Sequence, residues 1–510
     1  MSFIDYIFIP FLFLSIILYF CVPLKWRWFL LLINSLVFYC SWGILLLPFV
    51  AGAVLLSWGT ALLIERKYLQ LDQDLRVGIW TDKAEQNKQK QKVKKQCKYL
   101  VWIAVSILIV MLAASKMHWI SIGVPLGISY YTMSLIGYMA DVYWRKEKAE
   151  HNYFSLLLFA VYFPKILEGP ISKHRLLAAQ LKEGHRFDYQ RFCFGLQRIL
   201  WGYFKKLVIA DRLNILVSAV FSDYENYHGA VFLVAAIFGA FQLYCDFSGC
   251  MDIALGTSEI FGISMEENFN RPFFSRSAAE FWRRWHITLG AWFKDYVYMP
   301  LVISPALMKI SGKIRKKAGK RAGKAFITIV PLMTVWILTG VWHGTGWNYV
   351  VWGLYWGSII ICSTVFEPEL SRIPELLHLD KEKKGYQRMQ MIRTFFLFVG
   401  SRLLTLPANL QITWCIFRKI VKKIAPWELL DGTLYTLGLE RPEFIFVVMA
   451  LLALLYISRQ EEMGVSFRKK IAEFPIWCRW SVYYGALIIV IIFGVYGAGY
   501  SAGAFVYMNY

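Results

Sequence analysis

Residues 339–347 read Thr339-Gly340-Val341-Trp342-His343-Gly344-Thr345-Gly346-Trp347, and they lie inside an apolar run that extends from residue 326 to residue 366. His343 is the one side chain in this run that titrates near neutral pH. An ionisable group in hydrocarbon is costly and usually faces a bundle interior, a water-filled path or a partner. His343 is therefore either a functional residue or a histidine whose ring is hydrogen-bonded to a carbonyl at a helix end. The apolar run alone favours neither interpretation.

The composition of the whole chain is that of a membrane protein. Of 510 residues, 57% are hydrophobic, and the mean hydropathy of +0.45 is too high for a soluble protein of this length. Because a span needs ~20 apolar residues, the apolar runs predict an all-α, polytopic transmembrane bundle of about 10–12 spans. Short runs interrupted by Pro and Gly between residues 148 and 228 predict re-entrant or tilted helices. The candidate spans are residues 3–22, 28–45, 46–64, 99–115, 122–143, 229–247, 326–342, 347–366, 394–410, 442–458 and 480–497.

The net charge of +22 comes from basic residues that cluster between the apolar runs. This pattern favours cytoplasmic loops and anionic lipid headgroups as the partners of the bases, and it disfavours nucleic acid. The polar stretch 65–98 predicts a solvated helical arm in the cytoplasm, and residues 311–324 form a second basic segment. The count of spans places the bases between residues 418 and 423 outside the cell, although basic segments are expected in the cytoplasm. They indicate either an amphipathic interfacial helix or a miscounted span within residues 411–441.

A helix is predicted to start at Ser277. Ser277 followed by Glu280 is a capping box, and Glu280 is spaced to pair with Arg284. A continuous helix from this point places His286 on one aromatic face with Trp282, and the neighbouring bases are typical of an interfacial helix.

Asp246 and Asp252 form a second polar pair, at the end of the run 229–247. Two carboxylates beside Ser248 and Gly249 are compatible with a metal site, but no third ligand lies nearby in the sequence. A helix cap or a polar kink is the simpler interpretation, and we predict no metal site.

His343 and His286 are the two histidines in strongly aromatic, membrane-associated surroundings. Imidazole takes a proton near neutral pH, so the natural reaction is attack of a hydroxyl on an acyl group. Glycines at positions 340, 344 and 346 allow close backbone approach around His343.

Three stretches resemble the signature series of the membrane-bound O-acyltransferase family: residues 281–286 (FWRRWH), 292–301 (WFKDYVYMPL) and 340–344 (GVWHG). Residues 246–252 (DFSGCMD) and 268–272 (NFNRP) are similar to its bacterial branch of alginate and peptidoglycan O-acetylases. The resemblance implies three parts: N-terminal transmembrane helices (1–115), a catalytic core (116–366), and C-terminal transmembrane helices with an aromatic tail (367–510).

The same resemblance implies helices around a central tunnel, with His343 as the catalytic histidine and His286 as the second signature histidine. The charge pattern places His343 near the outer end of a hairpin. The resemblance places it deeper in the protein. The C-terminal tail resembles a motif in which a tyrosine, here Tyr507, holds the acyl group in transit, although an interfacial aromatic belt explains it equally well. The residues implied for substrate binding or the tunnel are Trp282, Trp285, Trp342, Asn270, Asp246 and Asp252.

The function expected from these observations is O-acetylation of a cell-surface polysaccharide or peptidoglycan by a multi-pass protein of the bacterial cytoplasmic membrane. Acetyl-CoA is the expected acyl donor, no cofactor is expected to be bound, and an extracytoplasmic SGNH-hydrolase-like acetyltransferase is the expected partner. Within the family the alternative is D-alanyl transfer to teichoic acid from a carrier-protein thioester. From another class, the alternative is a transporter or flippase.

Overall fold

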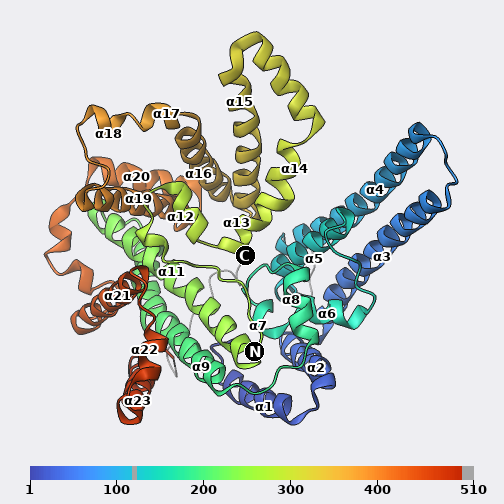
Figure 1. The fold of residues 1–510 in the computed structure, drawn as a ribbon. Helices are drawn as coiled ribbons and strands as arrows, with labels where there is room; N and C mark the ends of the chain where they lie inside the picture. The colour runs from blue at the N-terminus through green and yellow to red at the C-terminus, as the bar shows by residue number, and fades with distance from the viewer. Residues whose placement is uncertain (118–122, 497–510) are drawn as a thin grey trace. The chain divides into compact units, whose positions relative to one another are not determined.

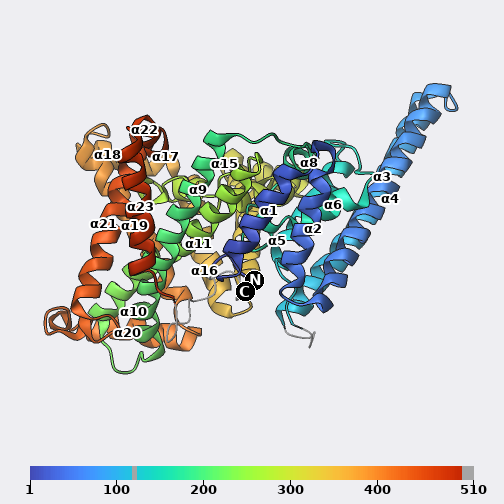
Figure 2. The same ribbon diagram turned by 90° about the horizontal axis from the view of Figure 1, so that it is seen from below.

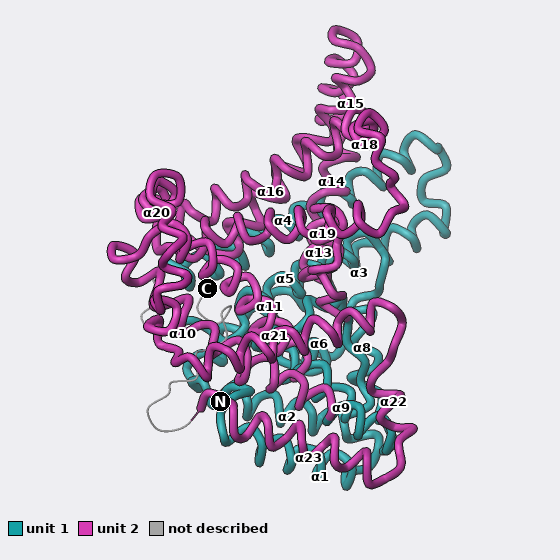
Figure 3. The backbone as a smooth tube through the Cα atoms, turned by 90° about the vertical axis from the view of Figure 1, so that its left-hand side faces the viewer, with its two compact units in different colours: residues 1–196, 254–266 teal, residues 197–253, 267–510 magenta. Residues whose placement is uncertain are grey.

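The computed structural model of the protein describes residues 1–117 and 123–496. In these residues the regular elements are helices, and Phe269 and Trp285 form an isolated antiparallel bridge. The predicted all-α class is therefore confirmed. The chain forms two compact units, unit 1 with residues 1–196 and 254–266, and unit 2 with residues 197–253 and 267–510 (Figure 3). The division expected near residues 115 and 366 stays a prediction.

Unit 1 contains the first eight helices. Two of them, α3 and α4, lie side by side as a long hairpin (Figures 1 and 2). The Asp82 side chain caps α4, and Lys67 Nζ donates to Gln96 Oε1 across the hairpin at 3.1 Å. Residues 65–98 are therefore helical up to Val77 and again from Lys83, and the cytoplasmic position of this arm stays a prediction. The helices are α1 (Phe8–Cys21), α2 (Arg27–Cys40), α3 (Leu47–Val77), α4 (Lys83–Lys116), α5 (Ile128–Tyr143), α6 (Tyr153–Val161), α7 (Phe163–Ile166) and α8 (His174–Lys182).

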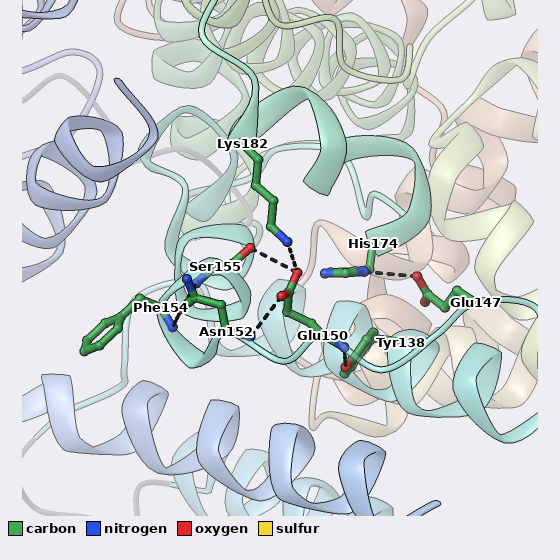
Figure 4. Close-up of polar contacts among 8 residues, drawn as sticks. All are labelled: Tyr138, Glu147, Glu150, Asn152, Phe154, Ser155, His174 and Lys182. Carbon is green, nitrogen blue, oxygen red and sulfur yellow. Dashed lines mark hydrogen bonds and ion pairs between the residues drawn. The ribbon is translucent and has the colours of Figure 1, made fainter. Parts of the chain in front are cut away.

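A polar cluster in unit 1 joins α6, α8 and the loop after α5 (Figure 4). The Glu150 carboxylate accepts from Ser155 Oγ at 3.2 Å and pairs with Lys182. Burial raises the pKa of Glu150, but the hydrogen bonds and the positive charge of Lys182 outweigh it, so the pKa lies below its ordinary value. His174 lies 3.0 Å from Glu147 Oε2 in the same cluster. The cluster therefore fixes α6 and α8 to the loop after α5.

Unit 2 is built around α11, and both α9 and α11 contribute residues to the two units. The helices from α9 onward are α9 (Tyr189–Tyr203), a π-helix (Phe204–Ala210), α10 (Asp211–Ser222), α11 (Gly229–Ile260), α12 (Ala278–Arg284), α13 (Ile287–Phe293), a second π-helix (Lys294–Tyr298), α14 (Met299–Val302), α15 (Pro305–His343), α16 (Trp347–Val365), α17 (Glu367–Leu370), α18 (Ile373–Leu376), α19 (Lys384–Thr405), α20 (Leu410–Lys422), α21 (Arg441–Glu462), α22 (Phe467–Glu473) and α23 (Ile476–Phe493).

Fewer long helices are present than the 10–12 spans expected. In the described residues, six helices are long and apolar enough to cross a membrane, or seven if one bent pair is counted as a span. The runs 3–22 and 28–45 become the helices α1 and α2, each of 14 residues. Such a helix is about 21 Å long, shorter than the ~30 Å hydrocarbon core. These two apolar runs therefore overstate the length of the helices that they form.

Two elements depart from simple spans, and only the second, α20, lies in a segment where the sequence indicated an irregular helix. The bent pair consists of residues 347–365 and 367–376, whose axes differ by 72°, as in a broken span or a re-entrant segment. Helix α20, which carries Lys419 and Lys422 in its last turn, is amphipathic and too short to span. An interfacial helix in residues 411–441 accounts for these bases better than a miscounted span.

Candidate active site

His286 lies at a break between two helices, which the sequence had predicted as one. Ser277 Oγ accepts from the Glu280 amide at 3.1 Å, and Glu280 pairs with Arg284 at 2.7 Å, so the expected start of the helix is confirmed. The helix nevertheless ends at Arg284, and His286 adopts φ 46° and ψ 52° before α13 begins. The continuous helix was wrong because Arg284 and Ile287 form backbone hydrogen bonds with the segment 268–270 instead.

Asn268 holds the break in place. Its Oδ1 accepts from the Thr288 amide at 3.0 Å and from Thr288 Oγ1 at 2.7 Å, and it lies 3.4 Å from His286 Nδ1. The backbone carbonyl of Asn268 accepts from the Ile287 amide at 3.0 Å. Asn268 is fully buried, so these bonds are shielded from water. One side chain therefore caps the start of α13 and positions the histidine that precedes it.

His343 is the last residue of α15 and is 7% exposed. A methyl group added at Gly340 would lie 2.3 Å from the Tyr349 carbonyl oxygen, and one at Gly344 would lie 2.2 Å from the Tyr349 ring. The predicted close approach at these glycines is confirmed, but the approaching group is α16. The glycines let α15 and α16 meet directly beside His343.

The two histidines face a shared aromatic environment. The ring centroids of His286 and His343 are 6.4 Å apart, and the Trp342 ring lies 5.9 Å from His286 and 4.9 Å from His343. Phe247 makes an edge contact with His286 at 4.8 Å. Burial and the neighbouring His343 hold the pKa of His286 well below its ordinary value. His286 is therefore neutral at pH 7.

A cavity of about 40 Å³ lies beside His343 in unit 2. A water molecule needs about 10–15 Å³ of such space, so the cavity has room for a few waters or for a small group such as an acetyl. Its walls are mostly aromatic, and apart from His343 on α15 the charged and hydroxyl-bearing aliphatic side chains come from the end of α19. The lining residues are Leu243, Trp282, Trp285, His343, Tyr349, Trp352, Phe398, Ser401, Arg402 and Thr405.

The structure brings some of the predicted site residues together and separates others. Trp282 and Trp285 line the cavity with His343, and Trp342 contacts both histidine rings. Asn270 is exposed and outside the cavity lining, and its backbone amide donates to the Arg284 carbonyl at 2.9 Å.

The carboxylates of Asp246 and Asp252 lie in an ion-pair network, outside the cavity lining. Lys206 Nζ lies 2.6 Å from Asp246, and Lys205 Nζ lies 2.6 Å from Asp252. Both lysines belong to the π-helix Phe204–Ala210, a rare backbone form that lets consecutive residues reach α11. Arg198 extends the network at 2.9 Å from Asp252. Phe247 lies next to Asp246 in α11 and contacts His286, so this helix carries the ion pairs and a histidine contact on neighbouring positions.

Three features of the site were missed in the sequence. Asn268 belongs to the family-like segment 268–272, yet nothing local in the sequence shows that its side chain reaches Thr288. Arg402 was read as part of a span, and a lone arginine near the end of an apolar run was the available signal. The pairing of Lys205 and Lys206 with two aspartates about 40 residues later had no local signal. Tyr507, the predicted acyl relay, lies outside the described residues.

The chain is similar to known membrane acyltransferases. The model of the membrane-bound O-acyltransferase family matches residues 87–312, which include His286 but not His343. A probable alginate O-acetylase AlgI of Azotobacter vinelandii is 29% identical over 89% of this chain and 82% of its own length. The peptidoglycan O-acetyltransferase of Helicobacter pylori is 29% identical over 64% of this chain and 62% of its own.

A third relative, the teichoic acid D-alanyltransferase of Bacillus subtilis, is 30% identical over 48% of this chain and 59% of its own. The similarity to these relatives therefore extends well beyond the short motifs around the two histidines. Together with the multi-pass helical fold, these matches show that the chain belongs to the membrane-bound O-acyltransferase family and is an O-acyltransferase.

Proposed function

We propose that this protein takes an acetyl group from cytoplasmic acetyl-CoA and passes it across the bacterial cytoplasmic membrane for O-acetylation of a cell-surface polysaccharide or peptidoglycan. The observation that carries the proposal is the small aromatic cavity beside His343, whose volume suits an acetyl group. The names of the alginate and peptidoglycan relatives support the same acceptor classes. An extracytoplasmic SGNH-hydrolase-like acetyltransferase then completes the delivery.

In this proposal His343 acts as the general base. Its imidazole takes the proton of the acceptor hydroxyl while the hydroxyl oxygen attacks the thioester carbonyl. The tetrahedral intermediate then expels the CoA thiolate, which takes the proton back from the imidazolium, so that no net proton is consumed. His286, neutral and 6.4 Å away between ring centroids, orients the acyl donor or shares the proton transfer.

D-alanyl transfer is the alternative within the family, and the D-alanyltransferase relative favours it. A D-alanyl group carries an ammonium next to the reacting carbonyl, whereas the positively charged residue Arg402 is one of those that line the cavity. Two like charges in an apolar site repel each other strongly. This charge supports acetyl as the transferred group. A transporter without covalent chemistry does not fit a member of an acyltransferase family.

The test is to delete the gene and to quantify ester-linked acetate and D-alanine released from the cell envelope. We expect acetate to fall and D-alanine to stay unchanged. A fall in D-alanine alone would select the alternative, and no change in either would contradict the acyltransfer proposal. Complementation with His343→Ala is expected to restore the protein in the membrane but less than about 1% of the acetylation, because general-base catalysis contributes 10²–10⁴-fold.

A further inference from the structure

Arg402 is the charged group of the cavity wall, and α19 presents it there by helical spacing. Phe398, Ser401, Arg402 and Thr405 are cavity-lining residues three or four positions apart, so they share one face of the last two turns of α19. The opposing walls come from α11, α12, α15 and α16 and are almost entirely aromatic or aliphatic. Arg402 and His343 therefore line the same small cavity.

The position of the guanidinium is fixed. Arg402 is 9% exposed, and its Nη1 donates to Thr405 Oγ1 at 2.8 Å. Arginine keeps its charge at any relevant pH, so it neither gives nor takes a proton in the reaction. Burying such a charge is costly, and its effect on a reacting group is large because the aromatic walls screen it poorly. Its contribution is therefore electrostatic.

The opposite wall carries a second donor. The buried indole N–H of Trp282 has no hydrogen-bond partner among the described residues. A buried donor without an acceptor is costly, and a carbonyl oxygen in the cavity is the type of group that satisfies one. Two donor-bearing residues thus border a space of about 40 Å³, and His343 borders the same space.

We propose that Arg402 is a catalytic residue that stabilises the negative charge on the acyl oxygen during transfer. This inference rests on the proposed function. When the acceptor oxygen bonds to the thioester carbon, the electron pair of the C=O bond moves to the carbonyl oxygen, and the guanidinium N–H groups donate to it. The C=O bond then reforms as the C–S bond breaks, so Arg402 is unchanged at the end. A preorganised donor in an apolar site is the arrangement expected for such a step.

The experiment compares Arg402→Gln and Arg402→Lys with a matched control on the same helix, Arg393→Gln. Arg393 is exposed and donates to the Arg276 carbonyl, so its loss removes a charge from α19 without reaching the cavity. The purified protein in detergent is assayed for acetyl transfer from acetyl-CoA, and kcat and KM are measured separately. Binding of a non-transferable acetyl-CoA analogue, with a methylene in place of the sulfur, reports the ground state.

We expect Arg402→Gln to lower kcat by about 10²–10³-fold, the loss typical of an oxyanion donor, while analogue binding changes less than about threefold. Arg402→Lys should keep part of the activity, Trp282→Phe should cost about tenfold, and Arg393→Gln should match the wild type. The alternative is that Arg402 only stabilises the C-terminal end of α19 through the helix dipole. In that role Arg402→Gln would lower the melting temperature and would weaken analogue binding by about the same factor as it lowers kcat. This pattern would overturn the inference.

The two proposals fail in different ways. If the wild-type protein transfers no acetyl group, or if His343→Ala transfers it normally, the proposed function is wrong and this inference falls with it. If the wild type and His343→Ala behave as expected while Arg402→Gln keeps a kcat within about threefold of wild type, only the inference on Arg402 is overturned.

Discussion

His286 combines a strained backbone with a buried position in the site. It has a positive φ of 46° and is 2% exposed, and its ring contacts Phe247 on one side and Trp342 on another. A residue with a Cβ in this left-handed conformation costs about 1–3 kcal/mol, and such residues cluster at functional sites. The conformation places the ring beside His343, a position that a continuous helix would not provide.

The first prediction separates the chemistry of His286 from its backbone. Asn tolerates positive φ well, so His286→Asn should keep the helix break while removing the imidazole. We expect the melting temperature to change by less than about 2 °C and acetyl transfer to fall about 100-fold, because proton transfer typically contributes 10²–10⁴-fold. The two measurements are thermal unfolding and initial rate on the same preparation. Normal activity would show that His286 is a structural residue.

At the scale of elements, the break between α12 and α13 is where sequence and structure differ most. The Ser277 cap and the pair between Glu280 and Arg284 were predicted from local spacing and are confirmed, because both interactions lie within one turn. The Glu280 carboxylate accepts from the Arg276 amide instead of the Ser277 amide that a full capping box requires. The end of α12 was not predictable in this way. It is decided by backbone bonds to residues 268–270 and by the buried Asn268 side chain, which no helical pattern contains.

The second prediction tests this cap with a matched pair of asparagines. Asn268→Ala removes the acceptor for two donors of Thr288, and we expect a loss of about 1–3 kcal/mol of stability and a clear loss of activity. Asn270→Ala alters an exposed side chain, and we expect little change in either quantity. Thermal unfolding and acetyl transfer measure both. Equal effects of the two substitutions would contradict the assigned role of Asn268.

At the scale of the whole molecule, unit 2 holds a buried ion-pair network that makes its stability depend on pH. Lys206 lies 2.9 Å from Asp211 and 2.6 Å from Asp246, and all three are at least 95% shielded from solvent. Burial and the nearby charge of Asp246 raise the pKa of Asp211 to about 7, although Lys206 lowers it. A carboxyl whose pKa is raised by folding keeps its proton up to a higher pH in the folded state than in the unfolded state. Its contribution to stability is therefore lost as pH rises through about 7.

The third prediction follows from that sign. Asp211→Asn keeps an acceptor for Lys206 but does not ionise. The melting temperature of the variant minus that of the wild type should therefore increase as pH rises from 5 to 8. The relevant quantity is the difference between the two melting temperatures at each pH, which cancels titration of other groups. We expect the difference to shift by several degrees, as a change of a few kcal/mol would produce in a membrane protein of this size. A difference that is independent of pH would contradict the raised pKa of Asp211.

Composition and short-range spacing were enough to predict the membrane class and the helical fold, and they singled out the two histidines as candidates. Each of these depends on composition, or on spacings within a few turns, and these are properties of the chain alone. The tertiary structure decided which residues share a site. It joined Arg402 to His343 in one cavity, placed Asn268 under His286, and directed Asp246 and Asp252 to lysines instead of the cavity. The physical reason is that buried polar groups must find partners wherever packing brings them, and those partners are set by contacts between residues far apart in the chain.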